Sequence, residues 1–78
     1  MKVFVKSLLG NGWEISNVHD TTLVANLKVL LHVQTGIPPQ RQRLHYSGRP
    51  LSDRETLATA RIREGATLQL VLQIHTGL

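Results

Sequence analysis

The four histidines are the residues whose spacing can be tested most directly against a known chemistry. They stand at positions 19, 32, 45 and 75. A histidine metal site needs a second ligand at a fixed spacing, such as a histidine four residues along a helix or a pair of cysteines. No two histidines are four residues apart, and the chain has no cysteine. The sequence therefore predicts neither a metal site nor a cofactor.

Catalysis by a serine, histidine and aspartate set is the next chemistry to consider. Such groups must converge in a concave site that holds a substrate. A single domain of 78 residues is too small to enclose a deep pocket. We expect that the chain is not an enzyme and has no small-molecule substrate.

Composition narrows the classes of partner and the compartment. The chain is 41% hydrophobic but only 4% aromatic, so its core must be aliphatic. Its net charge of +4 favours acidic partners, although the cations are scattered without interleaved aromatic residues, which disfavours nucleic acid. The absence of cysteine fits a reducing compartment, and no apolar run suits a signal peptide or a membrane span. We expect a cytoplasmic or nuclear protein that does not associate with membranes.

The first half of the chain reads as a hairpin followed by a helix. Met1–Lys6 alternates with a period of two, and the Asn11-Gly12 pair suits a tight hairpin turn. Alternation resumes at Trp13 and Ile15 and breaks near Asn17, where we expect a bulge or a strand end. The predicted N-caps of the helix are Asp20, Thr21 and Thr22. An apolar stripe predicts an amphipathic helix over 22–35, ended by Gly36.

The second half reads as short strands joined by turns. Arg43–Tyr46 and Thr67–Ile74 are predicted strands, and Ser47–Pro50 is a predicted turn. A right-handed crossover through the helix returns the chain to the same sheet. The sequence thus predicts an α+β fold in which a mixed sheet wraps around one helix.

Six segments of the chain resemble the ubiquitin family, in the same order along nearly the whole chain. They are Met1–Lys6, Gly36-Ile37-Pro38-Pro39, Gln42-Arg43-Leu44, Ser47–Leu51, Glu55-Thr56-Leu57 and Thr67–Leu72. The resemblance implies a β-grasp fold of four to five strands, with a ubiquitin-like domain over residues 1–74 and a flexible tail over residues 75–78. It also implies a core of thirteen positions: Val3, Val5, Ile15, Val18, Val24, Leu27, Leu31, Leu44, Leu51, Leu57, Ile62, Leu68 and Leu70.

The resemblance further implies a partner-binding face on the outside of the sheet. Its residues are Leu8, Leu9, Arg43, His45, Gly48, Arg49, Gln69 and Val71. His45 stands where the family has an isoleucine. The lost apolar contact is expected to weaken the binding of the family's usual partners by about 1 kcal/mol.

The C-terminus and the lysines bear on covalent attachment. Family members that are conjugated end in Gly-Gly, whereas Thr76 stands here in the first glycine position and Leu78 follows Gly77. Lys6 and Lys28 match lysines of ubiquitin and are candidate modification sites, although we expect them to be ordinary solvated charges. Arg49 and Glu64 occupy the positions of its two most used linkage lysines.

The unusual tail favours a non-catalytic adaptor domain over a conjugated protein. We expect a monomer of the ubiquitin–proteasome area whose partners are ubiquitin-binding domains or proteasome receptor subunits. Two alternatives stay open: a modifier conjugated through Gly77 after processing, and a basic nucleic-acid-binding module.

Overall fold

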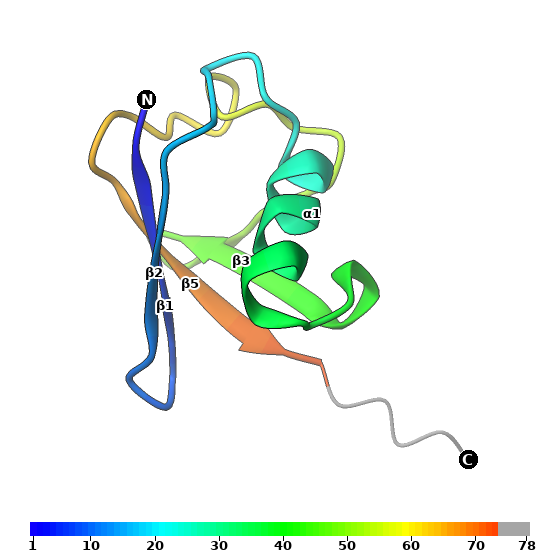
Figure 1. Ribbon diagram of the computed structural model, residues 1–78. Helices are drawn as coiled ribbons and strands as arrows, with labels where there is room; N and C mark the ends of the chain where they lie inside the picture. Colours follow the sequence, from blue (N-terminus) through cyan, green and yellow to red (C-terminus); the bar gives the residue numbers. More distant parts are fainter. Residues whose placement is uncertain (74–78) are drawn as a thin grey trace.

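The alternating and helical segments of the sequence form one mixed sheet and one α-helix in the part of the chain that the structure describes. The computed structural model describes residues 1–73. Its elements are β1 (Val3–Ser7), β2 (Gly12–Ile15), α1 (Val24–Thr35), the short 3-10 helix η1 (Pro39–Arg41), β3 (Gln42–Tyr46), β4 (Arg49–Pro50) and β5 (Thr67–Leu72), as labelled in Figure 1.

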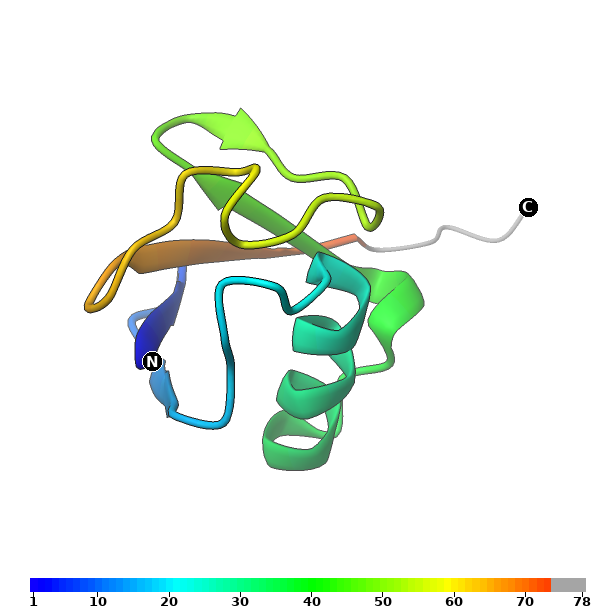
Figure 2. The same ribbon diagram turned by 90° about the horizontal axis from the view of Figure 1, so that it is seen from above.

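The sheet has five strands in the order β2-β1-β5-β3-β4. β1 and β5 are parallel, and the other neighbouring strands are antiparallel. Helix α1 lies across one face of this sheet, as the two views in Figures 1 and 2 show, while the other face stays uncovered by any helix of residues 1–73. This arrangement confirms the predicted α+β, β-grasp fold.

The core lies between α1 and the sheet and is almost entirely aliphatic. All thirteen predicted core residues are buried, the most exposed being Leu51 at 8%. Ala60 joins them at 3% exposure. Strand β2 ends at Ile15, which agrees with the strand end predicted near Asn17, and Val18 returns to the core.

The helix begins two residues later than predicted, and none of the three predicted N-caps caps it. Leu23 occupies the N-cap position without a side-chain hydrogen bond. The carbonyl oxygens of Glu55 and Asp53 accept hydrogen bonds from the N–H groups of Val24 and Ala25, at 2.8 and 3.2 Å. Because a distant loop satisfies these donors, no capping side chain is needed.

The first hairpin turn is longer than the tight Asn11-Gly12 turn predicted. Lys6 pairs with Gly12, so the loop comprises residues 8–11. Gly10 adopts a φ of 94°, and the N–H of Asn11 donates to the hydroxyl of Ser7. The left-handed position therefore belongs to Gly10, and the loop holds Leu8 and Leu9 out at the end of the hairpin.

The predicted turn over Ser47–Pro50 is a two-residue turn followed by a short strand. Ser47 and Gly48 have φ values of 52° and 76°, and Tyr46 pairs with Arg49 across them. Positive φ at both central residues is the geometry of a type I′ hairpin turn, whose twist matches that of its strands. Arg49–Pro50 thus extends the sheet as the edge strand β4.

Lys28 is not the solvated surface charge that the sequence predicted. It is only 8% exposed, and its Nζ atom lies 2.6 Å from Oδ1 of Asp53. The backbone carbonyl of the same residue accepts a hydrogen bond of 2.9 Å from the buried side chain of Gln42. The buried ammonium is held in an ion pair with Asp53, which disfavours its use as a modification site.

Candidate functional site

Strand register brings most of the predicted partner-binding residues together on the uncovered sheet face. Lys6 on β1 and His45 on β3 both pair with Gln69 on β5, which lies between them. Arg43 pairs with Val71 one row further along. Because successive side chains of a strand alternate between faces, these five lie on the side opposite α1. They form the surface that we call the outer face: Lys6, Arg43, His45, Gln69 and Val71.

His45 and Val71 are half-buried within this face, whereas the neighbouring Arg43 and Gln69 are exposed. The Nδ1 atom of His45 is buried and has no hydrogen-bond partner among residues 1–73. The ring therefore packs more like an apolar side chain on this face than its polarity suggests.

Gly48 and Arg49 border the outer face through the type I′ turn. Nη1 of Arg49 lies 3.0 Å from Oε1 of Glu55, and Oε2 of Glu55 accepts a hydrogen bond of 2.7 Å from the N–H of Ser52. The bond from Ser52, followed by the pairing with Arg49, lowers the pKa of Glu55. Arg49 is thus engaged by Glu55 and its cation is partly neutralised.

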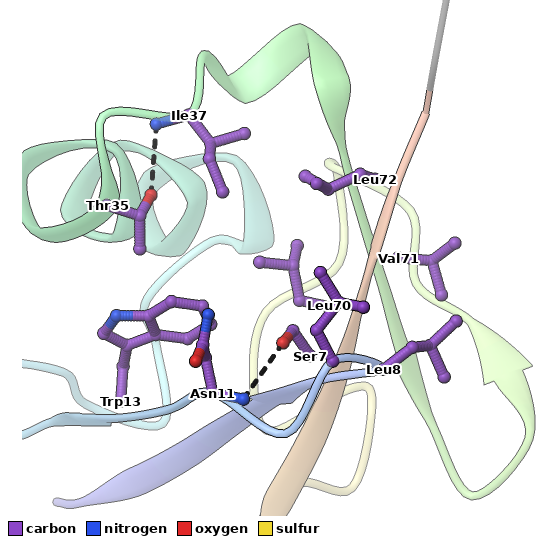
Figure 3. Close-up of a pocket in the computed structure, with 10 residues that line it drawn as sticks. Ser7, Leu8, Asn11, Trp13, Thr35, Ile37, Leu70, Val71 and Leu72 are labelled. Carbon is purple, nitrogen blue, oxygen red and sulfur yellow. Dashed lines mark hydrogen bonds between the residues drawn. The ribbon is translucent and has the colours of Figure 1, made fainter.

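Leu8 and Leu9 are large apolar residues that are strongly exposed, at 79% and 88%. Figure 3 shows Leu8 and Val71 pointing to the same side of β5. The loop therefore adds an apolar contribution to one end of the outer face, as predicted. Exposed aliphatic side chains beside cations suit the docking of another protein.

The structure adds a groove that the sequence did not reveal. A cavity of about 370 Å³ lies between the hairpin loop, the end of α1 and the end of β5 (Figure 3). Its lining includes Trp13, Ile37 and Leu72. These residues come from segments far apart in the chain, so local periodicity could not group them. The available signal in the sequence was Leu72, which has the same phase as Leu68 and Leu70 in an alternating strand. Those two leucines are buried, whereas Leu72 is half-exposed.

Aromatic residues are scarce among the cations of the outer face: half-buried Phe4 is the one aromatic residue at the outward-facing positions of strands β1, β3 and β5. Tyr46 is turned inward and packs against the core. Nε of Arg43 donates a hydrogen bond of 2.8 Å to Oε1 of Gln73. A stacking platform normally accompanies cations in single-stranded nucleic-acid sites. The arrangement fits a protein surface better than a base-stacking platform.

The remaining predicted site residues fall into two groups. Lys6 is exposed on the outer face. Thr76, Gly77 and the tail predicted over residues 75–78 lie outside the described residues.

Within residues 1–73 no group of three or more histidine, aspartate or glutamate side chains is placed to hold a metal ion. Nor does that part of the chain contain a helix with the length and apolarity to cross a membrane.

The fold and the outer face define a small β-grasp protein with one sheet face left uncovered by the helix. A family model described as the Ubiquitin family matches residues 3–74. The chain therefore belongs to the ubiquitin family, and it interacts with proteins, as ubiquitin-like proteins do. Membership also confirms that it is not an enzyme.

The relatives distinguish between the functions left open by the sequence. The chain is 41% identical over 78 residues to "NEDD8-like protein RUB1" of Saccharomyces cerevisiae, covering 99% of each chain. It is 33% identical to "Ubiquitin-like protein NEDD8" of Dictyostelium discoideum, covering 100% of each. By contrast, it matches only 13% of the length of a Ubiquilin from Dictyostelium discoideum, at 35% identity.

The prediction that the chain acts as an adaptor domain is wrong. The relatives that the chain matches over nearly their whole length include NEDD8-like proteins, which support the modifier alternative instead. The error came from the tail, because the threonine in the first glycine position was given more weight than the similarity along the rest of the chain.

Proposed function

We propose that this chain is a NEDD8-like protein modifier that is joined to other proteins through the carboxyl group of Gly77. The observation that carries the proposal is the similarity to NEDD8-like proteins over nearly the whole of both chains. Under this proposal residues 1–74 are the recognised body and residues 75–78 are the segment that enters the enzymes.

The proposed attachment begins with hydrolysis of the peptide bond after Gly77, which releases Leu78 and anything beyond it. An activating enzyme then joins the Gly77 carboxylate to AMP from ATP, with release of pyrophosphate. A cysteine thiolate of the enzyme displaces AMP to form a thioester. A lysine amine of the target finally displaces the thiol to give an amide bond.

Thr76 sets the main chemical demand of this proposal. Glycine lets the backbone approach closely because it has no Cβ, whereas threonine is branched at Cβ and stiff in χ1. The enzymes acting on this chain must therefore have room beside the residue before Gly77. We expect enzymes shaped for Gly-Gly tails to process it slowly, and Thr76→Gly to accelerate them.

The outer face supplies the proposed contact with activating and conjugating enzymes. Lys6 and Arg43 are exposed there beside half-buried Val71, and Leu8 extends the apolar part. An acidic enzyme surface with an apolar centre would complement it and accelerate association at low salt. We further propose that the protein acts in the cytoplasm or the nucleus.

A charging assay tests the proposal. The chain ending at Gly77 is incubated with ATP and the NEDD8-activating enzyme of the same organism, and the product is separated with and without a reducing agent. We expect an ATP-dependent adduct that the reducing agent removes, as a thioester requires. The control is Gly77→Ala, which should form far less adduct while its body remains folded.

Two outcomes separate the reasons for failure. If only Thr76→Gly is charged, the fold and outer face are competent and the native tail is the obstacle, which contradicts the proposed function. If neither chain is charged although both are folded, the outer face does not fit that enzyme and the proposal also fails.

A further inference from the structure

The large apolar side chains that are exposed in residues 1–73 fall into two separate groups. Leu8, Leu9 and Leu72 line the groove beside the outer face. The second group is on the helix side of the molecule and consists of Leu23, Val29 and Val33, exposed by 38%, 51% and 80%. The functional site described above accounts for the first group but not for the second.

Leu23 precedes α1, whereas Val29 and Val33 belong to an uncharged face of the helix that we call the outer helix face: Asn26, Val29, Leu30 and Val33. Their spacing of three, four and seven residues places them along one side of the helix. Lys28 is the one Lys, Arg, Asp or Glu residue of α1, and it is turned away into its ion pair with Asp53. The solvent side of a surface helix is normally charged.

Neither the core nor helix propensity accounts for Val33. Its side chain is 80% exposed, so it contributes little to the core. A β-branched residue is also a poorer helix former than alanine, lysine or glutamate at such a position. Val29 is likewise an exposed β-branched residue, one turn earlier in the helix. Contact with another surface explains both residues.

We propose that the outer helix face docks against the same face of a second copy of this chain, with the two helices antiparallel. A two-fold interface sets each surface patch against its own image, so any charge on the patch meets a like charge. The chain carries a net charge of +4, and this uncharged stripe lets two such cationic copies approach.

The geometry of the stripe agrees with an antiparallel pair. Val29 and Leu30 lie at the middle of the twelve-residue helix, where the two-fold axis would pass. Val33 of one copy then lies beside Asn26 of the other. Antiparallel helices also place the positive end of one helix dipole near the negative end of the other.

The pair is expected to be weak. A twelve-residue helix is about 18 Å long, so one helix face buries much less than the roughly 800 Å² per partner of a stable interface. We expect a dissociation constant on the order of 0.1–1 mM. The proposal replaces the monomer expected from the sequence. It goes beyond the proposed function, because the outer sheet face stays free in both copies.

Dilution of the full chain, followed by ¹H–¹⁵N NMR, tests the proposal. Between about 20 µM and 2 mM we expect progressive shifts confined to the amides of the outer helix face and their neighbours. Val33→Lys should weaken association at least ~10-fold, because it places two cations in the interface. Leu9→Lys is the matched control, since it adds the same charge at an exposed leucine of the other group and should leave the shifts unchanged.

Val33→Ala guards against a folding artefact. Alanine favours the helix, so this variant should unfold at the same or a higher temperature while associating several-fold more weakly. Shifts that do not depend on concentration up to 2 mM overturn the proposal. So does association that survives Val33→Lys, or that disappears in Leu9→Lys and thereby places the contact at the groove. None of these outcomes bears on charging at Gly77.

Discussion

The partly buried ion pair between Lys28 and Asp53 allows a quantitative prediction about stability. Asp53→Asn removes the anion but keeps a side chain of nearly the same size. It also keeps the backbone carbonyl that accepts a hydrogen bond from the N–H of Ala25. The change leaves the Lys28 ammonium nine-tenths buried, with a neutral amide in place of the carboxylate 2.6 Å away.

The expected cost follows from the burial of the two partners. Breaking a fully buried pair costs about 3–5 kcal/mol, and a hydrogen bond to a charged group contributes about 1.5–3 kcal/mol. The side chain of Asp53 is 60% exposed, so solvent already screens its charge. We therefore expect Asp53→Asn to lower the free energy of unfolding by about 1–2 kcal/mol.

Urea unfolding at neutral pH measures this cost. With a slope of about 1 kcal/mol per molar urea for a small domain, the midpoint should fall by about 1–2 M. The double variant Lys28→Met and Asp53→Asn should recover most of the loss, because methionine fills the stem of the lysine without a charge. Glu14→Gln is the control: it breaks a 3.6 Å pair with Lys2 whose side chains are 45% and 51% exposed, and should cost less than about 0.5 kcal/mol.

Two results would refute this reasoning. An unchanged midpoint in Asp53→Asn would mean that the pair adds nothing despite its short distance. A double variant as unstable as Asp53→Asn alone would mean that the loss comes from the Asp53 loop and not from the uncompensated ammonium.

Three further predictions concern the fold. The pKa of Glu55 is lowered in the folded chain, so its contribution to stability is present above its unfolded pKa of about 4.3 and is lost as the pH falls through the folded pKa. In urea titrations, the difference in unfolding free energy between wild type and Glu55→Gln should therefore shrink between pH 6 and pH 3. Arg61 has a φ of 62°, which asparagine tolerates better, so Arg61→Asn should raise the free energy of unfolding by about 0.5–1 kcal/mol, and a lower melting temperature would contradict this. Leu68→Ala should cost about 2–5 kcal/mol, because Leu68 is fully buried; a loss below 1 kcal/mol in chemical denaturation would show that the core collapses around the gap.

The core and the sheet could be predicted from the sequence because both follow from periodic burial. Val3 and Val5 alternate with outward residues, and Val24, Leu27 and Leu31 repeat with the helical period, so their partners need not be known. The outer face was instead implied by the family resemblance, and the strand phase agrees with it, since His45 and Val71 alternate with the core residues of their strands.

Features that depend on contacts between distant residues could not be predicted. Lys28 finds Asp53 25 residues away, and carbonyls of the Asp53–Glu55 loop replace the expected N-cap. The groove joins Trp13 to Ile37 and Leu72 in the same way. The functional error had a different origin, because the single residue Thr76 cannot outweigh a similarity that extends over the whole chain.

The central claim, attachment to other proteins through Gly77, is tested most directly by mass spectrometry of the tagged chain purified from cells under denaturing conditions. Arg63 is the last lysine or arginine of the sequence, so trypsin would leave residues 64–77 as a branch on each modified lysine. We predict peptides in which the carboxyl group of Gly77 is bound to a lysine ε-amine of another protein, absent from a Gly77→Ala control. If every recovered C-terminal peptide is unbranched, and denaturing gels show no adduct that depends on Gly77, the claim is contradicted.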